Sequence, residues 1–555
     1  MVGVKEKLPG VVYLPTERLA TYVTAGALPT TTLVEELAAS FRTHAARPAI
    51  CAADGIISYA ELNERTDRLA KGLLDLGLAP LDRVLFQSAN SPELVIALIG
   101  CLKAGLIPVC TLSAHRKVEI GYIGQSVDAR AHIVQGDDAK FDLEDFALSM
   151  KDEIPTVKHV ISLRGVPRAG VVRMEDLIAA TDAAAARAAV ENVPRDPFQV
   201  AIFQLSGGTT GVPKVIPRMQ NDYLLNAQLT AQTLGYRADD VMFMPMPIIH
   251  NACMICFLMP TLLVGGAFII AAGMSPKDWA DAWRRNPPTI IGVIRALFPR
   301  LDETLALVPE GLDPVRFFWC ADGARALREK YGKPAYGMFG MSEGMNMYCR
   351  EGDPGEALDW TVGRPLSEFD DVHLVRPGTM EQAAPGEIGE LIVRGPYTLA
   401  GYYNAPDRNR TAFTEDGYYR PGDLMVIREI GSSRYFAFAG RTKDVVDRGA
   451  EKINCEEVEA AVTTHPAVAA CAVIGMPDPV LGERVCAYIV PRPGDEAPDV
   501  ATMQAHLQSV GIAKFKWPER ILVIDSIPVT KVGKFDKGKL REDIAKRLEQ
   551  ETEKA

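Results

Sequence analysis

The chain has 555 residues, a hydrophobic content of 48%, a charged content of 24% and a formal net charge of −11. Its length excludes a single hydrophobic core, so several packed units are expected. The composition is typical of a soluble globular protein, and the acidic balance argues against a general nucleic-acid binder, which needs a basic face.

Short apolar runs alternate with amphipathic ones through most of the chain. A helix is predicted over 58–77, where Ser58 and Glu61 form a capping-box pattern and leucines recur at helical spacing. A strand is predicted at 82–88, and Ser91-Pro92-Glu93 opens the next helix with proline at its first position. Further strands are predicted at 106–111, 131–135, 159–163 and 267–272. This alternation predicts parallel sheets covered by helices.

The stretch "LSGGTTGVPKVI" at 205–216 follows a predicted buried strand, and an apolar run resumes after it. Glycines let backbone N–H groups turn toward an anion, threonine hydroxyls can donate to phosphate oxygens, and Lys214 supplies a positive charge. A Walker A motif would place Ser or Thr after Gly-Lys, whereas Val215 follows Lys214 here. On the loop alone, a phosphate cradle and a plain surface turn between strands both stay open.

The stretch from Ala252 to Met274 contains no charged residue and is long enough to span a bilayer. Pro260 and Gly265-Gly266 divide it, however. We therefore expect a buried helix, a turn and a buried strand instead of a membrane span.

Ten cysteines are scattered without framework spacing, and the first residues contain no apolar signal core. A cytoplasmic protein with reduced thiols is therefore expected. His250, Cys253 and Cys256 form an H-x-x-C-x-x-C pattern, which zinc could use only with a fourth ligand. We interpret the two cysteines as small apolar residues of a buried helix.

The character of the chain changes at 440–454, a polar and basic segment with two glycines. A shorter α+β pattern follows: Asn454 and Glu457 can cap a helix, 469–476 and 485–490 alternate like strands, and a last helix begins near Asp536. We place the boundary at 441–444. Residues 1–442 are then expected to form a large α/β domain of doubly wound sheets, and residues 443–555 a small mobile α+β domain.

Five short stretches follow one another in a specific order. They are the loop at 206–214, "FGMSEG" at 339–344, "YRPGDL" at 419–424, "GRTKD" at 440–444 and "GKFDK" around Lys534. Together they resemble the adenylate-forming (ANL) superfamily of acyl- and aryl-CoA synthetases, adenylation domains and luciferases, over nearly the whole chain. "HN" at 250–251, "RGPYTLAGYY" at 394–403 and "PGVVY" at 9–13 are most similar to the stand-alone aryl acid AMP ligases for 2,3-dihydroxybenzoate or salicylate.

The resemblance implies activation of a carboxylate. The carboxylate attacks the α-phosphate of ATP, a mixed anhydride forms, pyrophosphate leaves, and a thiol then displaces AMP. The protein positions two anions against each other and stabilises the added charge. In this family Thr209, Thr210 and Lys214 would hold the leaving pyrophosphate, and Glu343 would bind Mg²⁺ as a hard oxygen donor.

Further nucleotide contacts follow from the same resemblance. Asp423 matches the acid that accepts both ribose hydroxyls, Arg441 would contact the ribose or α-phosphate, and Phe339 would flank adenine. A turn aspartate, a linker salt bridge and a core aromatic are the respective structural alternatives. The full set expected around ATP is Ser206, Gly207, Gly208, Thr209, Thr210, Gly211, Lys214, Gly323, Gly337, Phe339, Asp423, Arg441 and Lys534.

Lys534 matches the lysine that bridges the carboxylate and the α-phosphate during adenylation. It lies in the small domain, so that domain has to swing in, and Lys443 stands where the family keeps its hinge. Rotation there would remove Lys534 and open a thiol tunnel. The residues expected to act directly in catalysis are Lys534, Thr210, Glu343 and His250.

The resemblance also implies an aryl pocket. Asn251 corresponds to the asparagine that binds the substrate's carboxylate or ortho hydroxyl, and His250 would order the pocket floor; a satisfied polar pair at a strand end is the alternative. The substrate contacts expected are His250, Asn251, Ala252, Cys256, Gly337, Ser342 and Asn346.

Three of these positions depart from the dihydroxybenzoate pattern. Ala252 replaces an aromatic residue, Cys256 stands where dihydroxybenzoate enzymes carry Ser and salicylate enzymes tend to carry Cys, and Asn346 replaces a small aliphatic residue. A site without the serine gains little from a catechol, and the space beside alanine is filled by a larger substrate or by neighbouring side chains. We expect a 2-hydroxy aryl acid with an alkyl group or a fused second ring, such as a substituted salicylate or a hydroxynaphthoate.

No carrier domain is recognisable after Lys534, so the thiol is expected from CoA or from the phosphopantetheine of an aryl carrier protein. Lys514, Lys516 and Arg520 could contact either partner. CoA is favoured because the pocket departs from the siderophore-type enzymes. The other classes considered are a luciferase-like enzyme that oxidises its adenylate and a catalytically inactive binding protein. The complete motif set argues against an inactive protein. Nucleic acid and membrane partners are not expected.

Overall fold

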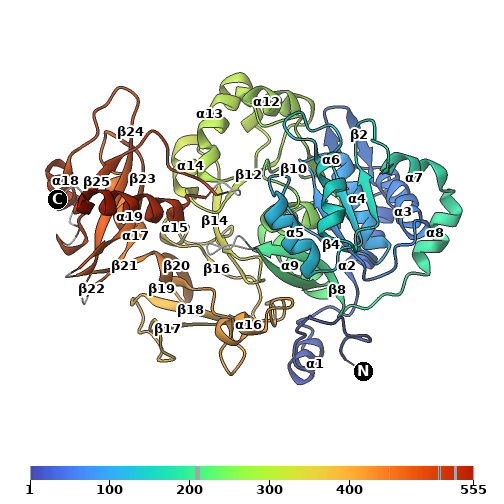
Figure 1. Cartoon of the computed structure of the whole chain (residues 1–555), viewed down its shortest axis with the longest axis horizontal. Helices are drawn as coiled ribbons and strands as arrows, with labels where there is room; N and C mark the ends of the chain where they lie inside the picture. Colours follow the sequence, from blue (N-terminus) through green and yellow to red (C-terminus); the bar gives the residue numbers. More distant parts are fainter. Residues whose placement is uncertain are drawn as a thin grey trace. The chain divides into compact units, whose positions relative to one another are not determined.

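The computed structural model describes residues 2–206, 213–448, 451–479, 481–510, 512, 514–530 and 534–553. Their contacts divide the chain into two compact units (Figure 1). The first contains Met1–Asp371 and Val393–Tyr419, and the second contains Val372–Ile392 and Arg420–Ala555. The mixed α/β class, with a larger N-terminal and a smaller C-terminal part, is confirmed; the division between residues 442 and 443 stays a prediction.

One sheet of the first unit carries the strand before the glycine-threonine loop. Within the described residues it has seven strands, in the order β7-β6-β5-β3-β4-β8-β9. All neighbours are parallel except β8 and β9. The strands are β3 (Arg83–Gln87), β4 (Ile107–Val109), β5 (Ala131–Val134), β6 (His159–Ser162), β7 (Val171–Arg173), β8 (Val200–Ser206) and β9 (Lys214–Met219).

The second sheet of the first unit has nine strands among the residues described, in the order β16-β15-β14-β13-β12-β10-β11-β1-β2. Its centre is parallel, and its two ends are antiparallel. The strands are β1 (Pro48–Ala52), β2 (Gly55–Ser58), β10 (Val241–Phe243), β11 (Ala267–Ile269), β12 (Ile290–Val293), β13 (Phe317–Cys320), β14 (Ala335–Gly340), β15 (Asn346–Tyr348) and β16 (Arg364–Pro365).

Helices pack against both sheets, as Figure 1 shows for α3, α4, α5 and α9. Those of the first unit are α1 (Thr16–Thr24), α2 (Leu33–Thr43), α3 (Tyr59–Asp75), α4 (Pro92–Lys103), α5 (Lys117–Ser126), α6 (Leu143–Glu153), α7 (Met174–Ala180), α8 (Ala183–Glu191), α9 (Gln220–Leu234), α10 (Asn251–Cys253), η1 (Met254–Leu258), α11 (Met259–Val264), α12 (Pro276–Arg285), η2 (Arg295–Leu297), α13 (Phe298–Leu307), η3 (Pro309–Leu312), α14 (Ala324–Tyr331), α15 (Gly355–Trp360) and α16 (Pro406–Ala412).

The predicted helix starts are confirmed. The Ser58 side chain accepts a hydrogen bond from the Glu61 N–H and starts α3, and Ser91 caps α4 with Pro92 in its first turn. Asn454 caps α17 (Cys455–Val462) through the N–H of Glu456, and not through that of the predicted Glu457. The cap oxygen satisfies an N–H group that has no partner inside the helix, which fixes the residue at which each helix begins.

The second unit holds two sheets. Within its described part, four strands follow the order β17-β18-β19-β20, and five strands form β22-β21-β24-β23 with β25 beside β24. The elements are β17 (Asp371–Val375), β18 (Gly389–Arg394), β19 (Asp423–Ile430), β20 (Ser433–Arg441), η4 (Thr442–Asp444), β21 (Val445–Arg448), β22 (Glu451–Asn454), α17 (Cys455–Val462), β23 (Val468–Asp478), β24 (Gly482–Pro491), α18 (Val500–Val510), η5 (Lys514–Lys516), β25 (Arg520–Val523) and α19 (Lys537–Glu553).

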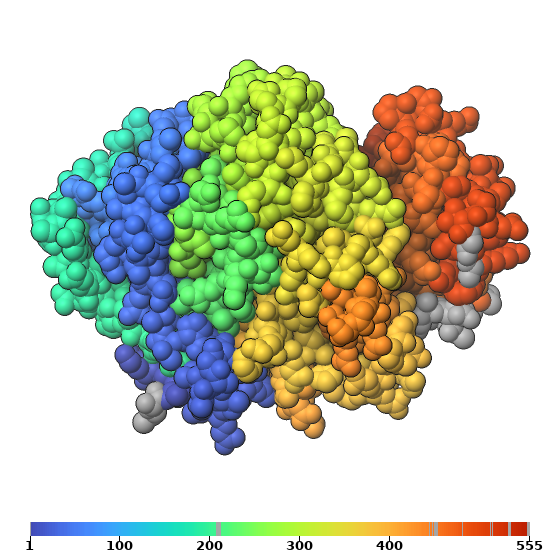
Figure 2. Space-filling model, turned by 180° about the vertical axis from the view of Figure 1, so that it is seen from behind, coloured from blue at the N-terminus to red at the C-terminus, as the bar shows by residue number. Residues whose placement is uncertain are grey.

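Segments far apart in the sequence share the core of the first unit. β1 pairs with β11, and the Tyr59 hydroxyl donates to the Gly266 carbonyl oxygen at 2.6 Å. On the surface seen in Figure 2, blue and green parts of the chain, which are far apart in the sequence, also lie side by side. These long-range contacts give the parallel sheet its strand order.

The uncharged stretch after His250 is a buried helix followed by a strand, as predicted. The helix does not stop at Pro260, however, and the turn comes only at Gly265, which has a φ of 85°. A π-helical turn, Met254–Leu258, precedes the proline. The wider π turn accommodates a residue that donates no backbone hydrogen bond. Across the described residues, no helix has the length and apolar character that crossing a membrane requires.

Candidate active site

Three predicted site segments share one edge of the nine-stranded sheet. β10, β12, β13 and β14 run parallel, so their carboxyl ends lie at the same edge. His250 follows β10, Gly323 follows β13 and caps α14, and Glu343 follows β14. In open α/β sheets this edge is where ligands bind.

Glu343 lies buried in a cluster of hydroxyl groups. The Tyr402 hydroxyl donates to Glu343 Oε1 at 2.7 Å, and the Tyr402 and Tyr419 hydroxyl oxygens are 2.8 Å apart. Burial, reinforced by the negative charge of Glu343, raises the pKa of both tyrosines, so both stay protonated donors. The next residue, Gly344, has a φ of 137°, and a Cβ there would lie 2.0 Å from the Tyr397 carbonyl oxygen. Only glycine allows this approach.

Arg218 is a positioning residue that the sequence reading did not find. Its fully buried guanidinium pairs with Asp222 at 2.9 Å and donates to the carbonyl oxygens of Ser342, at 3.0 Å, and Tyr397, at 3.3 Å. It thereby links β9, which follows the glycine-threonine loop, to the segment that carries Glu343. A lone arginine in the apolar run "PKVIPRM" was the available signal.

The glycine-threonine loop is attached at both ends to an antiparallel pair, in which Ser206 lies opposite Lys214. The Lys214 ammonium lies 5.0 Å from the centre of the Tyr402 ring, whose hydroxyl contacts Glu343. The predicted pyrophosphate and Mg²⁺ residues are thus brought together through one tyrosine. The predicted positions Gly207, Gly208, Thr209, Thr210 and Gly211 lie outside the described residues.

Asn251 is held by a buried polar chain. Gln204 Nε2 donates to the Tyr223 hydroxyl at 3.2 Å, and that hydroxyl donates to Asn251 Oδ1 at 2.8 Å. The Asn251 amide is therefore oriented with its NH₂ group directed away from Tyr223. His250 Nδ1 accepts from the Ala252 N–H at 3.2 Å, which places the ring proton of neutral His250 on Nε2.

Cys256 lies in the π turn and is fully buried. Its Sγ accepts a hydrogen bond from the Tyr348 hydroxyl at 3.0 Å, and its carbonyl oxygen accepts one from Tyr236 at 2.9 Å. Burial raises the pKa of Cys256 to about 12, against the opposing effect of the Tyr348 hydrogen bond. The side chain is therefore a neutral thiol, not a nucleophile.

The remaining predicted substrate residues lie on or beside β14 and β15, as does Phe339, which is predicted to flank adenine. Gly337 and Phe339 are in β14, Asn346 opens β15, and Ser342 stands between these strands. Phe339 lies opposite Met347, and Gly340 lies opposite Asn346. Neighbours along a strand face opposite sides, so Phe339 and Asn346 belong to different faces of this pair.

Asp423, Arg441 and Lys534 belong to the second unit. Asp423 begins β19 opposite Arg441 in β20, and their side chains form a 2.8 Å ion pair with Asp423 almost fully buried. Lys443 falls in the short turn η4 just after β20. Lys534 is exposed in a loop closed by the Val529–Phe535 bridge, and its carbonyl accepts the Thr530 N–H at 2.7 Å.

Of the three basic residues considered for the thiol partner, two make ion pairs within the second unit. Lys516 contacts Glu457 at 2.6 Å, and Arg520 contacts Glu551 at 2.5 Å. A CoA phosphate or an acidic carrier helix would have to compete with these carboxylates.

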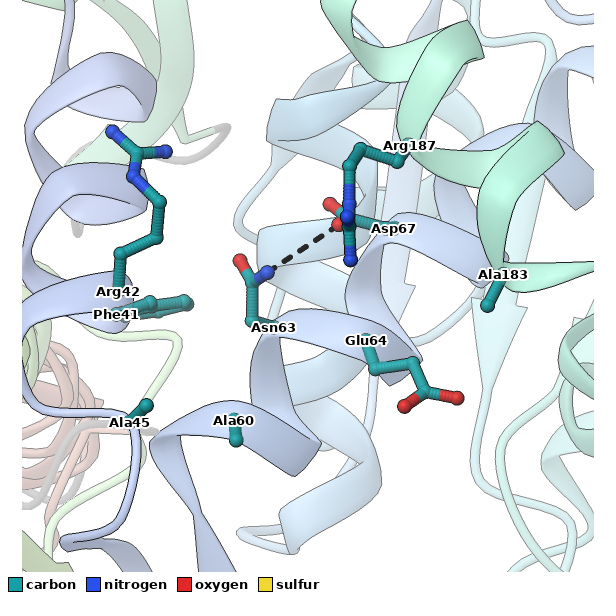
Figure 3. Close-up of a pocket in the computed structure, with 9 residues that line it drawn as sticks. All are labelled: Phe41, Arg42, Ala45, Ala60, Asn63, Glu64, Asp67, Ala183 and Arg187. Atoms are coloured by element: carbon teal, nitrogen blue, oxygen red, sulfur yellow. Dashed lines mark hydrogen bonds between the residues drawn. The ribbon is translucent and has the colours of Figure 1, made fainter.

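A hollow of about 350 Å³ lies apart from these residues, between α2, α3 and α8 (Figure 3). It is lined by Phe41, Arg42, Ala45, Ala60, Asn63, Glu64, Asp67, Ala183 and Arg187. Its carboxylate Asp67 is paired with Lys103 at 2.6 Å. None of the predicted site residues lines it, so we do not assign it to the aryl acid.

The donor set at Glu343 fits Mg²⁺. In the part of the chain that is described, no group of three or more His, Cys, Asp or Glu side chains could hold a metal ion. Mg²⁺ is usually bound through one or two carboxylates together with substrate phosphates, so a single buried carboxylate fits such a site.

Comparisons with known proteins agree with this geometry. The chain matches the family described as AMP-binding enzyme over residues 37–403 and the AMP-binding enzyme C-terminal domain over residues 457–534. It is 35% identical to the salicyl-AMP ligase / salicyl-S-ArCP synthetase of Mycobacterium tuberculosis, covering 96% of this chain and 94% of that protein. It is 34% identical to the 2-hydroxy-7-methoxy-5-methyl-1-naphthoate–CoA ligase of Streptomyces carzinostaticus, covering 96% of each.

Among solved structures, apo MbtA of Mycobacterium smegmatis is 33% identical, with a TM-score of 0.71, and the match covers 96% of this chain and 98% of that one. Adenylate-forming enzymes of this family use ATP and Mg²⁺, and a thiol accepts the acyl group. The chain belongs to the AMP-binding enzyme family of the adenylate-forming (ANL) superfamily.

Proposed function

We propose that this protein activates a 2-hydroxy aryl acid with ATP, through an aryl-adenylate, and then transfers the aryl acyl group to CoA. One observation carries the proposal: two polar groups lie at the same edge of the sheet. The Asn251 amide, which Tyr223 orients, follows β10, and the buried carboxylate of Glu343 follows β14. An acid held by Asn251 and a nucleotide near Glu343 would face each other there.

The first half-reaction joins two anions. A carboxylate oxygen of the acid forms a bond to the α-phosphorus of ATP, and the bond from that phosphorus to the pyrophosphate oxygen breaks. Mg²⁺ supplies compensating positive charge on the phosphates when it is bound. Glu343 would hold the cation, Lys214 would stabilise the leaving pyrophosphate, and Asn251 would orient the acid.

The second half-reaction breaks the mixed anhydride. The thiol sulfur bonds to the acyl carbon, the bond to the AMP oxygen breaks, and the thiol proton passes to solvent. We assign Lys534, which is exposed on a loop of the second unit, to the first half-reaction alone.

Two residues support a substrate larger than dihydroxybenzoate. Ala252 provides a short side chain beside Asn251, and Cys256 presents a thiol that already accepts the Tyr348 hydroxyl. Such a thiol is a weak hydrogen-bond partner for a catechol hydroxyl, whereas an apolar ring can pack against it. The naphthoate–CoA ligase that matches this chain along its length supports the same substrate class and acceptor.

A second candidate is a salicylate– or 2,3-dihydroxybenzoate–AMP ligase that loads an aryl carrier protein for siderophore or nonribosomal peptide synthesis. The relative named as a salicyl-S-ArCP synthetase, which matches over a similar length, favours it. CoA and a carrier present the same pantetheine thiol, so the acceptor must be tested directly.

The test is ATP–pyrophosphate exchange with benzoate, salicylate, 2,3-dihydroxybenzoate, alkylsalicylates, hydroxynaphthoates and a fatty acid, each with and without CoA. Fastest exchange with a bulky 2-hydroxy aryl acid, followed by thioester formation with CoA, is the expected result. Fastest exchange with salicylate or dihydroxybenzoate and no CoA thioester would support the carrier-loading candidate. Fastest exchange with the fatty acid would contradict both.

Tyr402→Phe is expected to raise the Mg²⁺ concentration for half-maximal exchange about tenfold, because a hydroxyl that orients a metal-binding carboxylate is lost. The Michaelis constant for the aryl acid should not change. Exchange measured across a Mg²⁺ titration checks this. The adjacent Tyr403→Phe is the matched control, since Tyr403 packs on Phe203 instead. Equal Mg²⁺ midpoints for the two variants would contradict the role given to Tyr402.

A further inference from the structure

Asn346 is a buried amide in an otherwise apolar strand. It is 2% exposed at the start of β15, and among the described residues its Nδ2 has no hydrogen-bond partner. A buried donor without a partner destabilises the fold, so a protein seldom keeps one that nothing ever satisfies.

The strand register shows which way this amide faces. Gly340 lies opposite Asn346, and Met338 lies opposite Tyr348, so these four residues share one face of the β14–β15 pair. Tyr348 on this face donates to Cys256 Sγ at 3.0 Å. The Asn346 side chain therefore lies on the side of the sheet that meets the π turn of the candidate aryl site.

Gly340 makes room for the amide. A Cβ at Gly340 would lie 2.3 Å from Asn346 Oδ1 and 2.8 Å from the Met338 methyl carbon. Any larger residue would displace the Asn346 side chain. The glycine and the asparagine are thus a matched pair that holds a carboxamide at this position.

A second carboxamide faces the same region from α9. Asn226 is fully buried, and neither its Oδ1 nor its Nδ2 has a partner in the described ranges. It lies three residues after Tyr223 and four before Thr230, on one helix face. Tyr223, one turn before Asn226 on this face, donates to Asn251 Oδ1. Asn226 therefore lies beside a residue that contacts the candidate aryl site.

We propose, on the basis of the aryl acid function proposed above, that Asn346 and Asn226 form a polar subsite for the ring of the substrate. The carboxylate is taken by Asn251, and Cys256 follows one helical turn later, so this subsite contacts the ring edge away from the carboxylate. Asn346 donates to a hydrogen-bond acceptor on that edge, a ring nitrogen or an ether oxygen. The substrate is a 2-hydroxy aryl acid that carries such an acceptor, and a purely hydrocarbon substituent or second ring is disfavoured.

The first experiment compares matched acids on the wild-type enzyme. Ethylsalicylates and methoxysalicylates substituted at the same ring carbon have nearly equal shapes, and hydroxynaphthoates can be compared with their ring-nitrogen analogues. At the best ring position, the acceptor-bearing acid should have a kcat/KM for exchange about ten- to a hundredfold higher. Equal or better exchange with the hydrocarbon partner at every position would overturn the proposal. No exchange with any aryl acid would instead overturn the proposed function.

The second experiment assigns the preference to the two amides. Asn346→Leu and Asn226→Leu should each reduce the ratio of acceptor-bearing to hydrocarbon acid about tenfold, mainly by raising the Michaelis constant of the acceptor-bearing acid. Met347→Leu is the control, because Met347 lies on the opposite face of β15 and should leave the ratio unchanged. A ratio that is unaltered in both asparagine variants, measured on folded protein, would contradict the subsite. The wild-type comparison decides the matter if the variants do not fold.

Discussion

Lys534→Ala is expected to lower the rate of aryl-adenylate formation about a thousandfold, while thioester formation from a supplied aryl-adenylate and CoA stays within about twofold of wild type. One positioned cation between two anions is worth about this much in other enzymes. The two half-reactions are expected to separate because Lys534 would act where the carboxylate meets the α-phosphate, which happens only in the first of them. The lysine is exposed in a loop closed by the Val529–Phe535 bridge, so its loss should not disturb the fold. Pyrophosphate exchange and single-turnover thiolation measure the two steps.

Lys539→Ala is the matched control for this experiment. Lys539 is another exposed lysine, five positions along the chain, with only a 3.8 Å contact to Asp536. It should leave both half-reactions unchanged. If Lys534→Ala weakened both steps equally, the assignment of Lys534 to adenylation alone, and with it the swing of the small domain, would be wrong.

Glu343→Gln is expected to slow adenylation about a hundredfold and to raise the Mg²⁺ requirement, because an amide oxygen is a weaker ligand for a hard cation than a carboxylate. The change should leave the fold intact, since a glutamine oxygen can still accept the Tyr402 hydroxyl. Exchange rates across a Mg²⁺ titration test both effects. The midpoint of thermal unfolding should stay close to that of wild type.

Glu351→Gln serves as the control for charge removal near the same strand pair. Glu351 is exposed just after β15, and within the described ranges no hydrogen bond or ion pair joins its side chain to a predicted site residue. Its Mg²⁺ dependence should match wild type. A Glu343→Gln enzyme with normal Mg²⁺ dependence would remove Glu343 from the metal site.

Local patterns in the sequence were sufficient for the helix starts and for most strands. Ser58, Ser91 and Asn454 each cap the helix that was expected, because cap chemistry acts over three residues and needs no tertiary partner. The fold class followed from the alternation of strands and helices. Strand order did not, since the pairing of β1 with β11 joins segments more than two hundred residues apart, for which one sequence carries no local signal.

In the candidate site, too, local motifs could be predicted from the sequence and tertiary contacts could not. Glu343 and Asn251 could be named from motifs, but the groups that hold them could not. Arg218 acts through carbonyl oxygens more than a hundred residues away, and Tyr402 was visible only as part of the motif "GYY". Pro260 was read as a helix breaker, although the π turn before it lets the helix continue. Such roles depend on which segments tertiary packing brings together.

The π turn at Met254–Leu258 also bears on how this enzyme could be altered. A π turn holds one more residue per hydrogen-bonded ring than an α-helix, so deletion of one residue within it, combined with replacement of Pro260, can restore ordinary helical bonding. Such a deletion would bring a different side chain opposite Tyr348 in place of Cys256. If Cys256 contacts the substrate as proposed, we expect libraries that contain single-residue deletions here to change the substrate range in ways that point substitutions do not.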